Sequence, residues 1–130
     1  MAGISVQLPL FLDQYDGPYT LNKTIKDAMK QNLKNLILTS PGERIMDPSF
    51  GVGIRNYLFQ NNNNITAGQI KSRIAEQVQI YLPHISILDI KIINDQNVDP
   101  LSDLDRHSIF INIVYVIEQL SVSDELDIKF

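Results

Sequence analysis

Few residues in this chain could perform acid–base or nucleophilic chemistry. Its 130 residues include no Cys, two His and four Glu. Without Cys there is no disulfide framework, thiolate zinc site or cysteine nucleophile. His84 and His107 are separated in sequence, and no spacing brings a partner carboxylate or nucleophile to either one. We therefore expect no catalytic residue, no metal site and no cofactor.

The Glu residues do not fit the active site of a glycosidase. Such an enzyme needs two carboxyl groups about 5–10 Å apart, one of them with a raised pKa. Glu43 is followed directly by Arg44. If their side chains interact, the Glu43 carboxylate stays ionised, which is wrong for a general acid. Glu76 falls on a predicted amphipathic helix, and Glu118 ends a predicted strand.

Two further motifs are incomplete. In the Asp-rich segment 94–106, Asp95, Asn97 and Asp99 have the spacing of the first ligands of a calcium loop. Pro100 replaces the required Gly and Arg106 the bidentate Glu, so we predict an acidic hairpin connection. Gly-Val-Gly at 51–53 lacks the third glycine of a nucleotide-binding loop.

Composition predicts a folded domain over residues 1–130, with 44% apolar residues and a net charge of −4. The charge is −2 over residues 1–21, +4 over 22–93 and −6 over 94–130. This distribution is typical either of solvated faces or of contacts with two different neighbours. Basic patches with interleaved aromatic residues are absent, so we expect no nucleic-acid partner. No apolar run is long enough for a spanning helix, so we expect no membrane partner.

The first half of the chain predicts an edge strand and a helix. Apolar residues alternate over 4–12, where Pro9 is compatible only with a sheet edge. Apolar residues then recur at helical spacing over 22–39, with Asn22 or Thr20 as N-cap. The Ser-Pro-Gly sequence at 40–42 ends this helix.

A short helix is predicted at 54–59, followed by an exposed loop at the four-Asn tract 61–64. A second long helix begins at Thr66, with Gln69 at capping-box spacing and Ile65 and Ile70 as a hydrophobic staple. It ends at Pro83, and its buried stripe comprises Ile70, Ile74, Val78 and Tyr81.

The last third predicts three strands, at 85–93, 108–118 and 125–130. Both faces of the middle one are apolar, which indicates a central strand. The fold class is therefore α+β: a small, mostly antiparallel sheet with two long helices and one short helix packed against it. The chain comprises an N-terminal extended segment (1–19), a core (20–118) and a terminal strand (125–130).

The densest constellation of unusual residues is a loop between the two long helices. A Pro-Gly stop is followed by the charged pair Glu43 and Arg44, a turn fixed by Pro48, and Phe50 as an aromatic anchor. Arg44 of this pair could bind a carboxylate of a partner protein bidentately. Alternatively, the pair could make only contacts within the chain, and spacing does not distinguish these alternatives.

This segment resembles the small baseplate-wedge proteins of contractile phage tails, type VI secretion and related contractile injection systems. The shared pattern is a leucine-rich helix, Thr-x-x-Gly-Glu-Arg, three residues, Pro-x-Phe-Gly, and a short helix ending in Leu-Phe. Here it is carried by Thr39, Gly42, Glu43, Arg44, Pro48, Phe50, Gly51, Gly53, Leu58 and Phe59. The resemblance covers most of residues 20–118.

The resemblance implies a structural protein that initiates polymerisation of the contractile sheath, in six copies per baseplate. Glu43, Arg44 and Pro48 match the motif that holds family members to the wedge, with Gly42, Phe50, Gly51, Gly53 and Phe59 as its scaffold. The sheath subunit is expected to add strands to the sheet, at the N-terminal strand or the C-terminal strand. Leu126, Ile128 and Phe130 of the C-terminal strand are the candidate residues. The implied partners are wedge proteins, the sheath subunit and tube or spike hub proteins. Assembly is expected in the bacterial cytoplasm, and the product belongs to the baseplate of a virion tail or injection particle.

Two other functions remain as alternatives. The family has carried a lysozyme-like label, which implies cleavage of peptidoglycan. A divergent relative is a regulatory anti-adaptor that protects another protein from proteolysis. The carboxylate pattern argues against the first alternative, and the Pro-Ser-Phe-Gly segment at 48–51 favours assembly over regulation.

Overall fold

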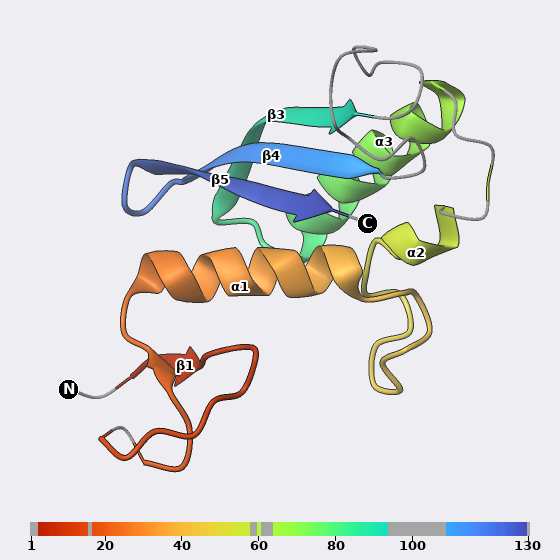
Figure 1. Cartoon of the computed structure of the whole chain (residues 1–130). Coiled ribbons are helices and arrows are strands. Elements are labelled where there is room, and N and C mark those ends of the chain that lie inside the picture. Colours follow the sequence, from red (N-terminus) through yellow and green to blue (C-terminus); the bar gives the residue numbers. More distant parts are fainter. Residues whose placement is uncertain (1–2, 16, 58–59, 61–63, 94–108, 130) are drawn as a thin grey trace, which may run out of the picture. The chain divides into compact units, whose positions relative to one another are not determined.

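The computed structural model describes residues 3–15, 17–57, 60, 64–93 and 109–129. The Asp-rich segment 94–106, His107, Leu58, Phe59 and Phe130 therefore lie outside the described residues, as does most of the four-Asn tract. The elements are, in order, β1 (Ser5–Val6), β2 (Leu21–Asn22), α1 (Ile25–Leu38), α2 (Ile54–Tyr57), α3 (Asn64–Tyr81), β3 (Ile85–Ile93), β4 (Phe110–Ile117) and β5 (Val122–Lys129) (Figure 1). This confirms the α+β class. The chain divides into two units, residues 1–35 and 36–130.

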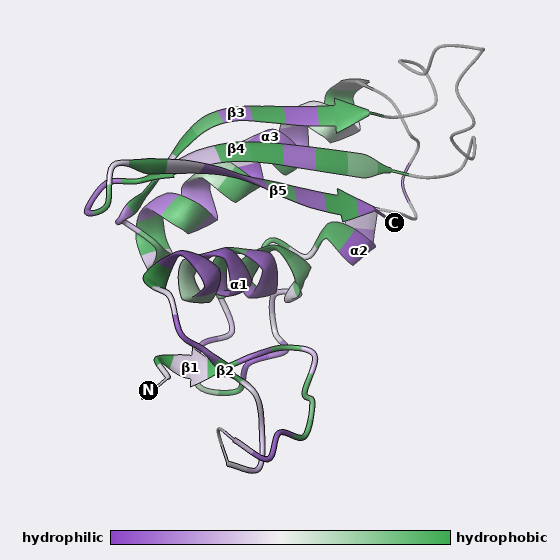
Figure 2. Cartoon of the chain, turned by 60° about the vertical axis from the view of Figure 1, so that its left-hand side comes forward, coloured by the Kyte–Doolittle hydropathy of each residue, from purple (hydrophilic) through white to green (hydrophobic). Residues whose placement is uncertain are grey.

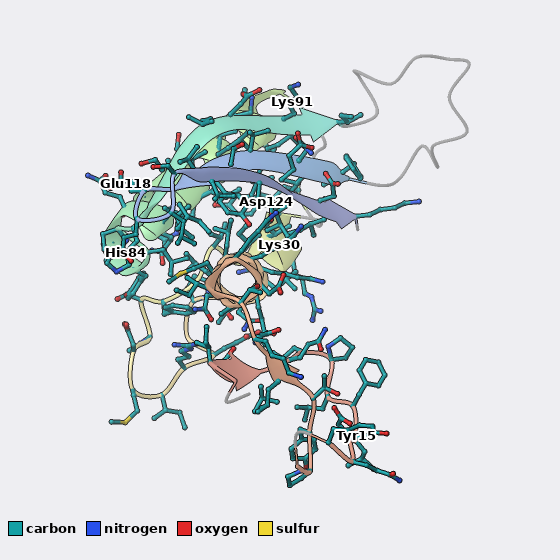
Figure 3. The ribbon with its side chains drawn as sticks, turned by 90° about the vertical axis from the view of Figure 1, so that its left-hand side faces the viewer. Tyr15, Lys30, His84, Lys91, Glu118 and Asp124 are labelled. Atoms are coloured by element: carbon teal, nitrogen blue, oxygen red, sulfur yellow. The ribbon has the colours of Figure 1, made fainter. Side chains whose placement is uncertain are left out.

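In the first unit, the strand predicted over residues 4–12 is wrong. Only Ser5 and Val6 form β1, which pairs antiparallel with β2. After β1 the Gln7 N–H still donates to the Thr20 carbonyl at 2.9 Å. The side chain of Gln31 also binds this segment: its Nε2 donates to the Val6 carbonyl and its Oε1 accepts from the Leu8 N–H, both at 2.9 Å. Pro9 has no N–H with which to continue a ladder. The apolar residues that follow are exposed, as is Tyr15 (Figure 3).

Helix α1 begins later than predicted, and its N-cap is Thr24 rather than Asn22 or Thr20. The Thr24 hydroxyl oxygen accepts a hydrogen bond from the Asp27 N–H at 3.2 Å. Asn22 is instead part of β2, and its side-chain amide donates to the Ser5 hydroxyl and to Gln31 Oε1. An amide engaged in these long-range bonds does not cap the following helix.

The second unit contains an antiparallel sheet in the order β3-β4-β5, as predicted for a central middle strand (Figure 1). Its alternating apolar residues place one buried row on each strand (Figure 2). The buried positions match across the register, as in the row Ile92, Ile111 and Ile128. The opposite face of β4 is only half-buried.

The terminal strand is longer than predicted and begins at Val122. The chain reverses direction just before it, where Ser121 adopts a positive φ of 50°.

Helix α3 lies across one face of this sheet (Figure 1). Its predicted stripe is confirmed at Ile70, Ile74 and Val78, which are buried, but not at Tyr81, which is half-buried. The predicted start at Thr66 is wrong, because the helix begins at Asn64 and Thr66 is a buried residue within it. The staple is also wrong, since Ile65 is 72% exposed. Starting the helix two residues earlier turns Ile65 away from the core.

Candidate functional site in the loop between α1 and α2

The Gly-Glu-Arg segment forms a closed loop between α1 and α2. The Gly42 N–H donates to the Pro48 carbonyl at 2.8 Å, which joins the two sides of the loop around residues 43–47. The Glu43 N–H donates to the Ser40 carbonyl and the Phe50 N–H to the Asp47 carbonyl. Gly42 has a φ of 92°, which a glycine adopts without strain. These bonds give the loop a defined shape.

The base of the loop is anchored at Gly51, a residue predicted as scaffold. Its N–H donates to Oε1 of Gln77 on α3 at 3.0 Å, and the Gln77 side chain is 2% exposed. Gly51 has a φ of 111°, and a Cβ atom here would lie 2.2 Å from the Thr39 carbonyl oxygen. Only glycine allows the two backbone segments to approach this closely. The Gly53 N–H also donates to the Thr39 carbonyl, at 2.9 Å.

A stack of side chains supports the outer part of the loop. The Arg44 guanidinium carbon lies 3.7 Å from the centroid of the Phe50 ring, a cation–π contact. Phe50 in turn meets Tyr81 of α3 edge to face, with 4.9 Å between ring centroids. The Tyr81 hydroxyl donates to Oδ1 of Asp47 at 3.1 Å. Partial desolvation, and secondly this bond to a carboxylate, raise the pKa of Tyr81 above its usual value.

The three residues predicted to bind the wedge are all exposed, and they differ in their contacts within the loop. The side chains of Glu43 and Pro48 are exposed. Arg44 is also exposed, but its guanidinium stacks on Phe50, so it makes a contact within the chain. A stacked guanidinium keeps its outward N–H groups, so stacking and partner binding are compatible.

Gln77 and Tyr81 hold this loop, and sequence reasoning gave neither of them this role. Tyr81 was expected only as part of the buried stripe of α3. Gln77 is a polar residue seven positions after Ile70, on that same stripe. A polar side chain on a buried helix face needs a hydrogen-bond partner, and this signal could have marked Gln77 as a structural residue.

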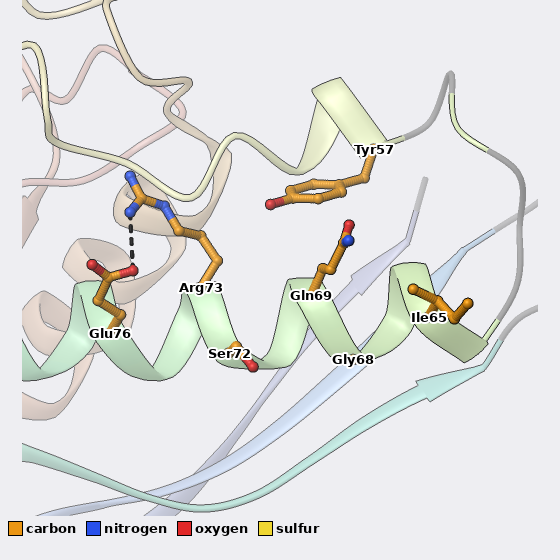
Figure 4. A pocket seen from close by; sticks show the side chains of 7 residues that line it. All are labelled: Tyr57, Ile65, Gly68, Gln69, Ser72, Arg73 and Glu76. Carbon is orange, nitrogen blue, oxygen red and sulfur yellow. Dashed lines mark hydrogen bonds and ion pairs between the residues drawn. The ribbon is translucent and has the colours of Figure 1, made fainter.

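A groove of about 580 Å³ lies beside the loop, between α2 and α3 (Figure 4). It is lined by Tyr57, Ile65, Gly68, Gln69, Ser72, Arg73 and Glu76. Arg73 forms an ion pair with Glu76 at 3.0 Å and also donates to the Gly51 carbonyl at 3.4 Å. Glu76 is the one carboxylate among these lining residues. Arg73 thus links the groove to the base of the loop.

Of the remaining candidate residues, His107 and the Asp-rich segment 94–106 lie outside the described residues. His84 lies exposed in the turn between α3 and β3, where its carbonyl accepts from the Glu118 N–H at 3.0 Å (Figure 3). The described part of the chain contains no cluster of three His, Asp or Glu residues that could hold a metal ion. Among the described residues, no helix combines the length and apolarity needed to cross a bilayer.

Comparison with known proteins identifies the family. Residues 23–120 match the family described as "Baseplate wedge protein gp25". The chain belongs to this family. The match includes the loop, α3, β3 and β4. The gp25 baseplate wedge protein of Enterobacteria phage T4 is 33% identical over 66 residues, which are 51% of this chain and 50% of the T4 protein. The chain thus matches about half the length of this relative.

Two solved structures share the gp25-like fold. One is described as a putative tail lysozyme from Geobacter sulfurreducens, with a TM-score of 0.68 and 22% identity over 85% of this chain and 94% of that one. The other belongs to the six-fold symmetrised baseplate of the anti-feeding prophage, with a TM-score of 0.68 and 24% identity over 87% and 83% of the chains. At these identities the likeness shows the fold alone.

Proposed function

We propose that this protein is a non-enzymatic structural subunit of a contractile-tail or injection-system baseplate. It docks on the wedge through Glu43, Arg44 and Pro48, and it templates sheath polymerisation by strand addition. Its partners are wedge proteins, the sheath subunit, and tube or spike hub proteins. Six copies assemble into each baseplate in the bacterial cytoplasm. Membership of the gp25 baseplate wedge family supports the baseplate role.

The observation that carries the templating role is the outer edge of β5. Within the described part of the chain, β5 pairs with β4 alone, so its other edge has no strand partner, and of its N–H groups that of Glu125 donates to Oδ1 of Asp124 at 2.9 Å. Leu126 and Ile128 point into the core and fix the orientation of β5. Strand addition uses the backbone, so the buried side chains remain in place.

The opposite edge, β3, is a poorer template. Its pairing with β4 shifts register between Ile87 and Asp89, whereas β5 pairs regularly from Val122 to Lys129. A bulge bends and twists a strand and disfavours edge-to-edge pairing. We therefore assign the sheath contact to β5.

The groove between α2 and α3 supports assembly over lysis. Glycosidases use two carboxyl groups that flank the sugar. The groove offers Glu76, and this carboxylate is paired with Arg73. Among the residues that line the groove, no second carboxyl group lies opposite Glu76, as such an enzyme requires.

Hydrogen exchange of the full-length protein tests the templating role. We expect the purified sheath subunit to slow exchange of the outward-facing amides of β5, while β3, the matched edge of the same sheet, keeps its rates. Protection of β3 instead, or of neither strand, would contradict the assignment. We expect the same preparation not to cleave peptidoglycan. Cleavage that is lost in Glu76→Gln would support the lytic alternative instead.

A further inference from the structure

The tip of the closed loop carries two large apolar side chains that touch almost nothing within the chain. Ile45 is 94% exposed and Met46 is 97% exposed, more than any other large apolar residue in the described second unit. Single exposed apolar residues are common on protein surfaces. Two adjacent exposed apolar residues at the tip of a projecting loop are less common, and they require an explanation.

The loop is built to hold this tip in one conformation. The hydrogen bond from Gly42 to Pro48 closes it immediately below the tip. Arg44, the neighbour of Ile45, stacks on Phe50, and Asp47, the neighbour of Met46, accepts the Tyr81 hydroxyl. Both flanks of the tip are therefore tied to helix α3 through an aromatic pair. A loop ordered before binding loses less conformational entropy on association.

We propose that Ile45 and Met46 form an apolar anchor that enters a pocket on a neighbouring baseplate wedge protein. This inference rests on the proposed function, since it requires that the loop faces the wedge. The tip lies between Arg44 and Pro48, so it is continuous with the proposed wedge-binding surface. A few residues that fill well-packed pockets on a partner carry most of the energy of protein interfaces.

The charged residues beside the tip indicate which residues to expect at the rim of the partner's pocket. Glu43 is exposed beside the tip, and Asp47 follows it, while the Arg44 guanidinium lies over the Phe50 ring. The outer surface of the tip is therefore apolar with a carboxylate at its margin. The matching site has apolar walls and a Lys or Arg on its rim, facing Glu43.

Incorporation into baseplates tests the anchor. The double variant Ile45→Ser, Met46→Ser is expressed in cells that make the rest of the particle, and its amount per purified baseplate is measured by mass spectrometry. We expect at least a tenfold loss against the wild type, about the effect of losing a hot spot. The matched control is Ile80→Ser, Leu88→Ser, which removes two exposed apolar residues from α3 and β3, away from the loop and the groove, and is expected to incorporate normally. Thermal unfolding of both variants checks that each is folded.

The outcomes distinguish failure of the proposed function from failure of the apolar anchor. If the wild type is absent from baseplates, the proposed function fails. If the wild type is present and the tip variant incorporates equally well, the anchor is wrong and the proposed function stands. A photo-crosslinking residue at position 46 identifies the occupant: a cross-link to a wedge protein supports the proposal, and a cross-link to a second copy of this chain, or none, overturns it.

Discussion

The amide oxygen of Gln77 accepts a hydrogen bond from the N–H of Gly51 across 26 residues of sequence, at 3.0 Å and out of contact with water. This bond attaches the base of the charged loop to helix α3. It explains how a loop with few apolar contacts keeps a defined position on the second unit. The proposed wedge contact depends on it.

Replacing Gln77 with Leu should destabilise the protein by about 1–3 kcal/mol, because the buried Gly51 N–H loses its acceptor. The free energy of unfolding in urea measures this. Gln79→Leu is the matched control on the same helix, since Gln79 is exposed, and its effect should stay within about 0.5 kcal/mol. Equal effects of the two substitutions would show that the Gln77 bond contributes nothing.

Gly51→Ala should also destabilise, by about 1–3 kcal/mol for the positive φ alone, with the clash against Thr39 in addition. Gly68→Ala provides the contrast. Gly68 lies within α3 and a Cβ atom there meets nothing within 4 Å, so alanine should stabilise by about 0.5–1 kcal/mol. Urea unfolding of both variants checks the opposite signs, and a neutral Gly51→Ala would contradict the described loop geometry.

The raised pKa of Tyr81 predicts a pH dependence of stability at the alkaline end. The folded pKa lies above the ordinary value of 10.0, so folding favours the protonated hydroxyl. Its contribution is fully present below pH 10 and is lost as pH rises through the folded pKa. The difference in unfolding free energy between wild type and Tyr81→Phe should therefore narrow above pH 10. A difference that stays constant from pH 8 to 11 would contradict the raised pKa of Tyr81.

Arg44→Ala should separate folding from assembly. Loss of an exposed cation–π contact costs about 0.5–1 kcal/mol, so the variant should remain folded by circular dichroism. Incorporation into baseplates should nevertheless be lost, because the charged loop is the proposed wedge contact. Arg44→Lys tests geometry: lysine keeps the charge but not the planar donor fork, and should restore incorporation only in part. Normal sheathed particles from Arg44→Ala would contradict the role of the loop.

Much of the second unit could be predicted from local patterns. The alternation of apolar residues in 109–117 placed β4 at the centre of an antiparallel sheet, and the stripe from Ile70 to Val78 placed the buried face of α3. These patterns are clear because every second residue of a half-buried strand, and every third to fourth residue of a helix, faces the core. They do not depend on distant parts of the chain.

Element ends and the support of the loop could not be predicted in this way. Asn22 does not cap α1 because Ser5 and Gln31 engage its side chain, and the side chain of Gln31 also binds the backbone at Val6 and Leu8, where β1 ends. The loop residues were found by their motif, but their contacts to Gln77 and Tyr81 join segments more than 25 residues apart. Such contacts leave no local periodicity in the sequence.

If this protein initiates the contractile sheath, as we propose, particles made without it lack sheath, and electron microscopy shows this. Cells that encode the whole particle but lack this protein are compared with cells in which it is restored. We expect baseplates bearing tubes without sheath, and a return of sheathed particles on restoration. Full-length sheaths attached to baseplates in the absence of the protein would contradict it.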